Sequence, residues 1–235
     1  MRVFLTTLIL CCAVGAQAQT ISFPEWQVMS EKDMRLLPRY GDKQKTAEQV
    51  ASDEEFVRLT MAQGGAPKQA SEHLVDMGFD LLRGGNMVQA MYRFNQAFLV
   101  RPTNTDIYAG YGAFFMAMDR PIEAHEQYSA GLALDSTNTL LLTGEATVQL
   151  HDRYQYQLEE SDRQADRCLA IATKLLTRSQ ELDPKNADTA YKLAVCQEAL
   201  MNCEKAWKFY DLALELGVKT SDESFPVQLM KTCPR

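Results

Sequence analysis

The stretch SEHLVDMGFDLLRGGNMVQAMYRFNQAFLVRPTN, residues 71–104, is followed at once by TDIYAGYGAFFMAMDRPIEAHEQYSAGLALDSTN, residues 105–138. The two stretches match in pattern at a spacing of 34 residues, and seven of eight compared positions keep their size class or chemical character. The pairs are Leu74 and Tyr108, Met77 and Tyr111, Gly78 and Gly112, Leu81 and Phe115, Ala90 and Ala124, Phe94 and Tyr128, Ala97 and Gly131, and Pro102 and Ser136. A fixed period of this length is typical of structural units that stack on one another.

Each stretch has the pattern of a helix hairpin. Glycine or alanine stands where two helices cross closely, and large apolar or aromatic side chains fill the space on either side. Pro102 then ends the second helix of the first unit, because proline cannot continue a helix. The pattern resembles the tetratricopeptide repeat (TPR). This resemblance implies an all-α, right-handed solenoid of helix pairs with a concave groove for a ligand.

Two further units follow, and the first of them is interrupted. Its first helix is expected from about Thr139 to His151, but the alanine that should open the second helix arrives 14 residues late, at Ala172. The residues between, 154–167, contain no proline or glycine, so we expect two longer helices that project from the solenoid. The regular spacing then returns. The units are predicted at about 71–104, 105–138, 139–186 and 187–218, and the TPR resemblance covers about Ser71 to Val218.

The segments outside the units have simpler patterns. Residues 46–66 show helical periodicity ended by Gly64-Gly65-Ala66-Pro67, which predicts an N-terminal packing helix. Residues 219–235 are expected to form the C-terminal cap that a solenoid needs to cover its last apolar face. Residues 19–45 lack clear periodicity, and we expect an extended arm.

The N-terminus has the features of a secretory signal peptide at residues 1–18. Arg2 precedes an apolar run from Val3 to Val14, and Ala16-Gln17-Ala18 predicts cleavage before Gln19. We therefore expect a soluble, exported protein, periplasmic or on the cell surface or secreted. Cys11 and Cys12 raise the alternative of a lipid anchor, although Leu10 and Cys11 stand where small residues normally precede a lipidated cysteine.

Charge and composition narrow the classes of partner. The full chain has a net charge of −7, which becomes −8 without residues 1–18, so nucleic acid is a poor partner. His73, His125 and His151 are far apart in sequence and none has a second metal ligand at a suitable spacing. We expect no catalytic residues, no metal and no cofactor. A membrane is expected as a partner only through a lipid or a partner complex.

The TPR resemblance assigns the ligand-facing side of the first helix of each unit. Its floor is mostly apolar, and Val75 and Phe79 stand where chaperone-binding members place lysine and asparagine to hold a terminal carboxylate. We therefore expect a protein or peptide ligand, an apolar helix or an extended segment, bound by an envelope scaffold of bacterial origin. The predicted partner-binding residues are Glu72, Val75, Phe79, Leu82, Arg83, Asp106, Ala109, Ala113, Met116, Leu140, Thr143, Thr147, Tyr191 and Val195.

Two other interpretations stay open on the sequence. In one, the chain is a structural accessory subunit whose groove is filled by its own segment Ile21 to Leu37, with Phe23 and Trp26 lying across it. In the other, more remote interpretation, the chain is an enzyme of an unrecognised type.

Four cysteines remain after residue 18, and export would allow them to form disulfides. We expect bonds between Cys168 and Cys196 and between Cys203 and Cys233, because antiparallel helices bring those helix ends together. The spacings from Cys168 to Cys203 and from Cys196 to Cys233 are both close to one repeat. The alternative is four unbonded, buried thiols.

Overall fold

The computed structural model describes residues 21–63, 65–218 and 224–235. Within these ranges the chain forms eleven α-helices and two short 3-10 helices, and it contains no strand. The prediction of an all-α solenoid is confirmed. The expected signal peptide, its cleavage site before Gln19, and Cys11 and Cys12 lie outside the described residues.

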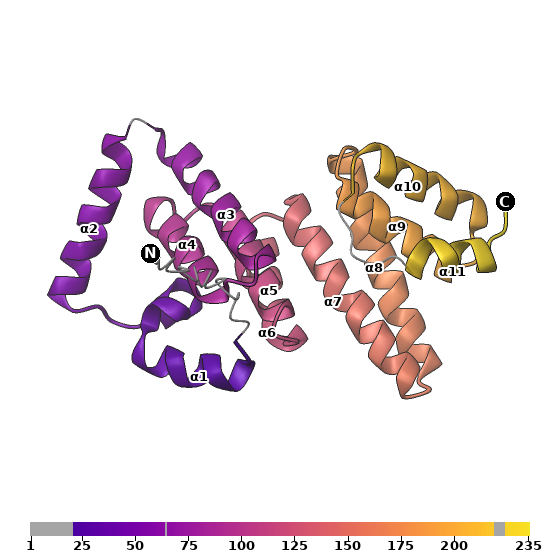
Figure 1. Ribbon diagram of the computed structural model, residues 1–235, viewed down its shortest axis with the longest axis horizontal. Coiled ribbons are helices and arrows are strands. Elements are labelled where there is room, and N and C mark those ends of the chain that lie inside the picture. Colours follow the sequence, from indigo (N-terminus) through magenta and orange to yellow (C-terminus); the bar gives the residue numbers. More distant parts are fainter. Residues whose placement is uncertain (1–20, 64, 219–223) are drawn as a thin grey trace, which may run out of the picture.

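Four helix pairs follow one another along the solenoid (Figure 1). They are α3 (Pro67–Arg83) with α4 (Met87–Val100), α5 (Asp106–Met116) with α6 (Pro121–Leu134), α7 (Thr139–Leu158) with α8 (Asp162–Leu182), and α9 (Ala187–Ala199) with α10 (Cys203–Glu215). The helix α11 (Ser224–Thr232) follows the last pair. Each pair falls close to one of the four predicted units, and α11 falls within the predicted cap.

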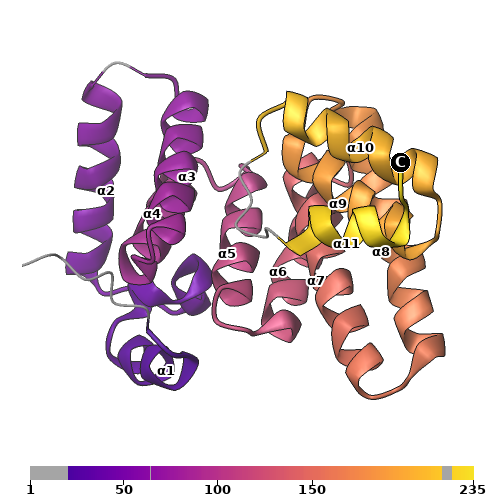
Figure 2. The ribbon, with the colours of Figure 1, turned by 45° about the vertical axis from the view of Figure 1, so that its right-hand side comes forward.

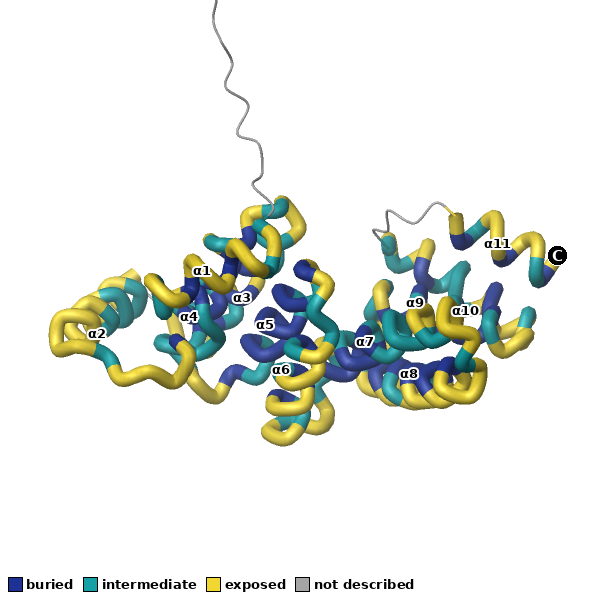
Figure 3. The backbone as a smooth tube through the Cα atoms, turned by 90° about the horizontal axis from the view of Figure 1, so that it is seen from below, coloured by how far each residue is buried: buried dark blue, intermediate teal, exposed yellow. Residues whose placement is uncertain are grey.

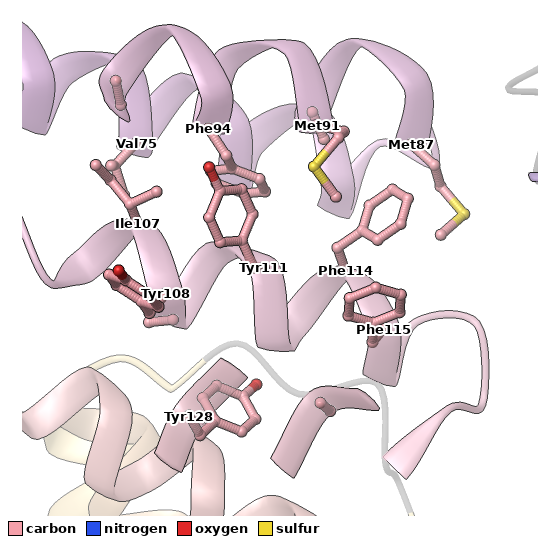
Figure 4. Packing of buried hydrophobic residues seen from close by; sticks show 14 of the residues in the cluster. Val75, Met87, Met91, Phe94, Ile107, Tyr108, Tyr111, Phe114, Phe115 and Tyr128 are labelled. Carbon is pink, nitrogen blue, oxygen red and sulfur yellow. The ribbon is translucent and has the colours of Figure 1, made fainter. Parts of the chain in front are cut away.

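An aromatic ring held between two glycines sets the spacing of the first three units. The Phe94 ring on α4 lies between Gly78 of α3 and Gly110 of α5, so that a Cβ on either glycine would lie 2.4 Å from the ring. The Tyr128 ring on α6 lies in the same way between Gly112 of α5 and Gly144 of α7. Figure 4 shows both rings within the buried cluster. The helices of neighbouring units can therefore approach only because these positions lack a side chain.

The third unit keeps this architecture and adds length to it. The helices α7 and α8 have 20 and 21 residues, and they pack along each other into a hairpin that extends beyond its neighbours (Figure 2). Its tip exposes Tyr154 and Leu158, which are 58% and 63% accessible. The long helices are those predicted from the sequence of residues 154–167.

The N-terminal arm is not extended, and this expectation was wrong. Residues of the arm form α1 (Phe23–Lys32) and the 3-10 helices η1 (Met34–Leu36) and η2 (Pro38–Asp42). The helix α1 is started by a capping box, in which the Ser22 hydroxyl accepts from the Glu25 amide and the Glu25 carboxylate accepts from the Ser22 amide. This local signal, together with Pro24 in the first turn, outweighs the lack of hydrophobic periodicity.

The arm packs against α4 and against the end of α5. Trp26 meets the rings of Phe114 and Phe115 edge-on and donates through Nε1 to the Leu36 carbonyl at 3.0 Å. The Asn95 amide of α4 donates to the Arg35 and Leu37 carbonyls at 2.8 and 2.9 Å. Backbone carbonyls of the arm thus accept the hydrogen bonds of a buried polar side chain of the solenoid.

The helix α2 (Ala47–Ala62) connects the arm to the first unit and has no buried residue. It packs on α3 and α4, and Phe56 is partly buried against the main hydrophobic cluster. It lies at the end of the molecule away from α11 (Figure 3).

Replacing Gly110 with valine tests the ring-and-glycine packing. The new side chain would collide with the Phe94 ring, and we expect the free energy of unfolding to fall by about 1–3 kcal/mol, the usual cost of overpacking. Gly65→Val is the matched control, because a Cβ at Gly65 meets nothing within 4 Å. Equal urea-unfolding midpoints for the two variants would contradict the packing argument.

Candidate functional site

The first helices of the first three units line one concave groove. The helices α3, α5 and α7 lie side by side, and side chains from them surround two adjoining hollows. One of them, which we call the inner hollow, has a volume of about 320 Å³. The other, which we call the acidic hollow because five carboxylates line it, has a volume of about 840 Å³. Both lie near the range of pockets that bind ligands in proteins.

The inner hollow is lined mainly by small and apolar side chains. Its lining is Phe79, Ala109, Ala113, Met116, Tyr128, Leu140, Thr143, Gly144, Thr147, Asn186, Asp188 and Lys192. The acidic hollow is lined by Glu72, Val75, Asp76, Phe79, Asp80, Arg83, Asp106, Leu140, Ala187, Asp188, Gly217 and Val218. Because Phe79, Leu140 and Asp188 belong to both linings, the hollows form one continuous surface.

Eleven of the fourteen predicted partner-binding residues line these hollows. The other three are Leu82, Tyr191 and Val195. Leu82 packs against the main hydrophobic cluster beside the groove. Tyr191 and Val195 belong to the C-terminal cluster, in which the Phe225 ring of α11 packs against Tyr191.

Sequence reasoning missed several lining residues. Tyr128 comes from the second helix of its unit, which the TPR resemblance does not assign to the groove. Gly217 and Val218 reach the groove from the end of α10. The glycines at 112 and 144, 32 residues apart on either side of Tyr128, were a signal that its ring passes between two helices.

The acidic hollow has a strong excess of negative charge. Five carboxylates line it, and Arg83 is the one cation in its described lining. Arg83 pairs with Asp80 at 2.5 Å, Asp188 pairs with Lys192, and Asp106 accepts from the Asn138 amide at 2.6 Å. Glu72 also pairs with Lys68 at 3.8 Å, so Asp76 and Asp106 are the lining carboxylates without a cationic partner among the described residues, and these two favour a cationic ligand.

The helix α11 closes the groove face of the fourth unit. The Phe225 ring lies 5.3 Å from the Tyr191 ring, and the Gln228 amide donates to the Glu198 carboxylate at 3.3 Å. A disulfide joins Cys203 at the start of α10 to Cys233 just after α11. The Trp207 indole donates to the Cys233 carbonyl at 2.7 Å. The chain's own C-terminus therefore covers α9 around Tyr191, whereas Asp188 and Lys192 near the start of α9 still line the hollows.

The predicted bond between Cys168 and Cys196 is not present, because both cysteines are free and buried. The prediction placed Cys168 at the start of the second helix, but α8 begins six residues earlier, at Asp162. Cys196 on α9 and Thr173 on α8 lie equally far from the turn that connects the two helices, and the Cys196 thiol is hydrogen-bonded to Thr173. Cys168 lies five residues away along α8, about 7.5 Å at the rise of an α-helix.

The interpretation that the groove is filled by the chain's own arm is also wrong. No residue from Ile21 to Leu37 lines either hollow among the residues that the structure describes. The arm packs on the opposite layer, on α4, because Asn95 and Tyr92 there bond to Arg35, Leu37 and Asp33. The described residues of the arm thus leave both hollows open.

One polar cluster outside the groove has the order of a hydrolase triad. His125 contacts both Glu145 carboxylate oxygens through Nδ1 at 2.9 Å, and its Nε2 lies 3.4 Å from the Ser129 hydroxyl. Acyl transfer also needs donors that stabilise an oxyanion. The amides around Ser129 lie inside α6 and are used by its own carbonyls. The cluster joins α6 to α7.

Two absences hold within residues 21–63, 65–218 and 224–235. No helix there combines the length and the apolar character that a bilayer span requires. No group of three or more histidine, cysteine, aspartate or glutamate side chains there is arranged to hold a metal ion.

These features define an α-solenoid of helix pairs with a concave groove that the described part of the chain leaves open. No protein-family model matches the sequence, and a comparison with curated proteins gives no match. Among solved structures, the chain is similar to TTC0263, a thermophilic TPR protein of Thermus thermophilus. The TM-score is 0.58 and the identity 16%, over 70% of this chain and 84% of that one. The chain therefore has the tetratricopeptide-repeat fold.

Two other TPR structures are similar at lower scores, and the fold assignment does not rest on them. The first TPR of Spaghetti (RPAP3), bound to an HSP90 peptide, has a TM-score of 0.41 and 17% identity over 56% of this chain and 94% of its own. PilF of Pseudomonas aeruginosa has a TM-score of 0.36 and 21% identity over 71% and 86%.

Labelling with iodoacetamide tests the cysteine assignment. In denaturant without reductant we expect Cys168 and Cys196 to react and Cys203 and Cys233 to be protected. In the native protein Cys196 should react slowly, because burial raises the pKa of its thiol to about 11 and the thiolate is the reactive form. Its labelling rate should rise with pH up to that value. Peptide mapping that finds Cys203 labelled before reduction would contradict the assignment.

Proposed function

We propose that this chain is a protein-interaction scaffold whose groove binds a polypeptide segment of a partner. The observation that carries the proposal is the open, mostly apolar groove floor formed by three successive units. Helical repeats of this kind generally use their extended concave surface for binding. The described part of the arm does not compete for this surface.

Apolar side chains supply the main binding surface. Phe79, Met116 and Leu140 line the groove, and Leu140 is 40% exposed. Burying such surface against a partner's apolar side chains contributes about 25 cal/mol per Å². Val75 and Phe79 offer no cation or amide, and the lining cations Arg83 and Lys192 are already paired with Asp80 and Asp188, so we expect the groove to hold an internal segment instead of a terminal carboxylate.

The site of action that we propose is the cell envelope. Two features support it: the signal-like sequence of residues 1–18, and the disulfide between Cys203 and Cys233, which persists in oxidising compartments. Scaffolding a larger envelope assembly would use the groove for a partner and leave α11 as a fixed cap.

A test of the location is N-terminal sequencing of the chain after expression in a bacterium with an intact export pathway. We expect the chain outside the cytoplasm with Gln19 as its first residue, because the peptide before it has the features that signal peptidase recognises. Recovery from the cytoplasm with residues 1–18 attached would contradict the proposed location.

The groove itself is tested by Leu140→Asp. This residue is exposed and lies in the first turn of α7, where a carboxylate favours the helix, so the fold should be kept. Peptides selected from a random library on the unmodified protein should bind the variant at least about tenfold more weakly, since a buried charge replaces an apolar contact. Fluorescence anisotropy measures the affinities.

Ile122→Asp is the matched control. Ile122 is 70% exposed on α6 and lines neither hollow. The control should bind the selected peptides with unchanged affinity. Equal binding to all three proteins, or a selection that enriches no peptide, would refute a peptide-binding groove.

A further inference from the structure

The inner hollow exists because one repeat position changes between the first two units. In the first unit Phe79 covers the Phe94 ring edge-on, with ring centroids 5.4 Å apart. The residue 34 positions after Phe79 is Ala113, and the residue 34 positions after Phe94 is Tyr128. Because alanine does not reach across, the end of the Tyr128 ring is left uncovered at the groove floor, and both residues line the hollow.

Tyr128 brings a hydroxyl to this floor. Its ring starts on α6, in the outer layer, and passes between Gly112 of α5 and Gly144 of α7. The hydroxyl is the atom farthest from the α6 backbone, so it lies on the groove side. Tyr128 is only 3% exposed, and no hydrogen bond from the described residues reaches its hydroxyl. Among the described residues the Tyr128 oxygen is not one of the buried side-chain atoms that lack a partner, so solvent reaches it, and a ligand group in the hollow can bond to it in place of water.

The surroundings favour a cation as that ligand group. Burial raises the pKa of Tyr128, and the negative charges of Glu145 and Asp188 raise it further. The acidic hollow adds four more carboxylates along the same groove, of which Asp76 and Asp106 have no cationic partner among the described residues. The walls of the inner hollow, Ala109, Ala113 and Met116, are apolar and suit an aliphatic stem.

We propose that the inner hollow is a subsite for a lysine or arginine side chain of the bound partner segment. The aliphatic stem lies on Ala109, Ala113 and Met116, and the cationic head donates a hydrogen bond to the Tyr128 hydroxyl and faces Asp188. Lys192, which also lines this hollow, already pairs with Asp188 in the unbound chain, so this edge accommodates an ammonium group, and the incoming head must share Asp188 with Lys192 or displace it. The inference rests on the proposed peptide-binding groove and adds the class of side chain that it selects.

The experiment compares two synthetic peptides of leucine and glycine that differ at one central position. One has lysine there and the other has norleucine, which keeps the stem and lacks the ammonium group. Affinities are measured for the unmodified chain, for Tyr128→Phe, and for Tyr154→Phe. The last is the matched control, because Tyr154 is exposed at the tip of the α7–α8 hairpin.

We expect the unmodified chain to prefer the lysine peptide by at least about tenfold, the effect of one hydrogen bond to a charged group. Tyr128→Phe should reduce this preference several-fold without weakening the norleucine peptide, and Tyr154→Phe should leave it unchanged. A preference that survives Tyr128→Phe in full overturns the assignment of the hydroxyl.

A second pair of variants separates this inference from the proposed function. Ala113→Phe restores the side chain found at Phe79 and should fill the hollow, so both peptides should bind more weakly, whereas Ala130→Phe on the exposed face of α6 should not affect them. If Leu140→Asp abolishes binding but Ala113→Phe and Tyr128→Phe do not alter it, the groove stands and the subsite is refuted. If neither peptide binds the unmodified chain and the library selection also fails, both proposals are refuted.

Discussion

The contact on which the rest of the structure depends is the aromatic ring held between two glycines of neighbouring units. Phe94 and Tyr128 each pass between two helices that could not approach so closely if either glycine carried a side chain. The ring fixes the distance between the first helices of successive units. The width and curvature of the groove follow from that distance. The third unit has Ala146 and Leu176 in the corresponding places, and both are fully buried.

Much of this architecture could be predicted from the sequence, because the contact recurs at a fixed spacing. The positions of the helices, the lengthened third unit and the terminal cap all follow from that spacing and from where it is broken. What could not be predicted depends on local or three-dimensional detail. The helix in the arm depends on the capping interaction of Ser22 with Glu25, and the separation of Cys168 from Cys196 depends on where α8 begins.

The candidate site, like the fold, was predicted from the sequence only in part. The TPR resemblance indicated the groove face of α3, α5 and α7, and most of the residues assigned there line the hollows. It did not indicate Tyr128, because this residue belongs to the second helix and reaches the groove only between two glycines. It also could not indicate that α11 covers Tyr191, since α11 lies outside the repeated pattern. Equivalent positions differ between units, as with Phe79 in the first unit and Ala113 in the second. These differences give the same repeated backbone different local surfaces.

The hydrogen bonds of the arm have a consequence for dividing the chain into autonomous pieces. Asn95 and Tyr111 are buried in the repeats, yet Asn95 donates to two arm carbonyls and the Tyr111 hydroxyl accepts from the Arg39 amide. A fragment trimmed to the repeats alone would leave the Asn95 amide without its acceptors and would uncover Phe114 and Phe115. The smallest fragment of this protein that keeps these contacts therefore begins before its first repeat. A fragment whose bounds are set by the repeats alone would be too short to fold in the same way.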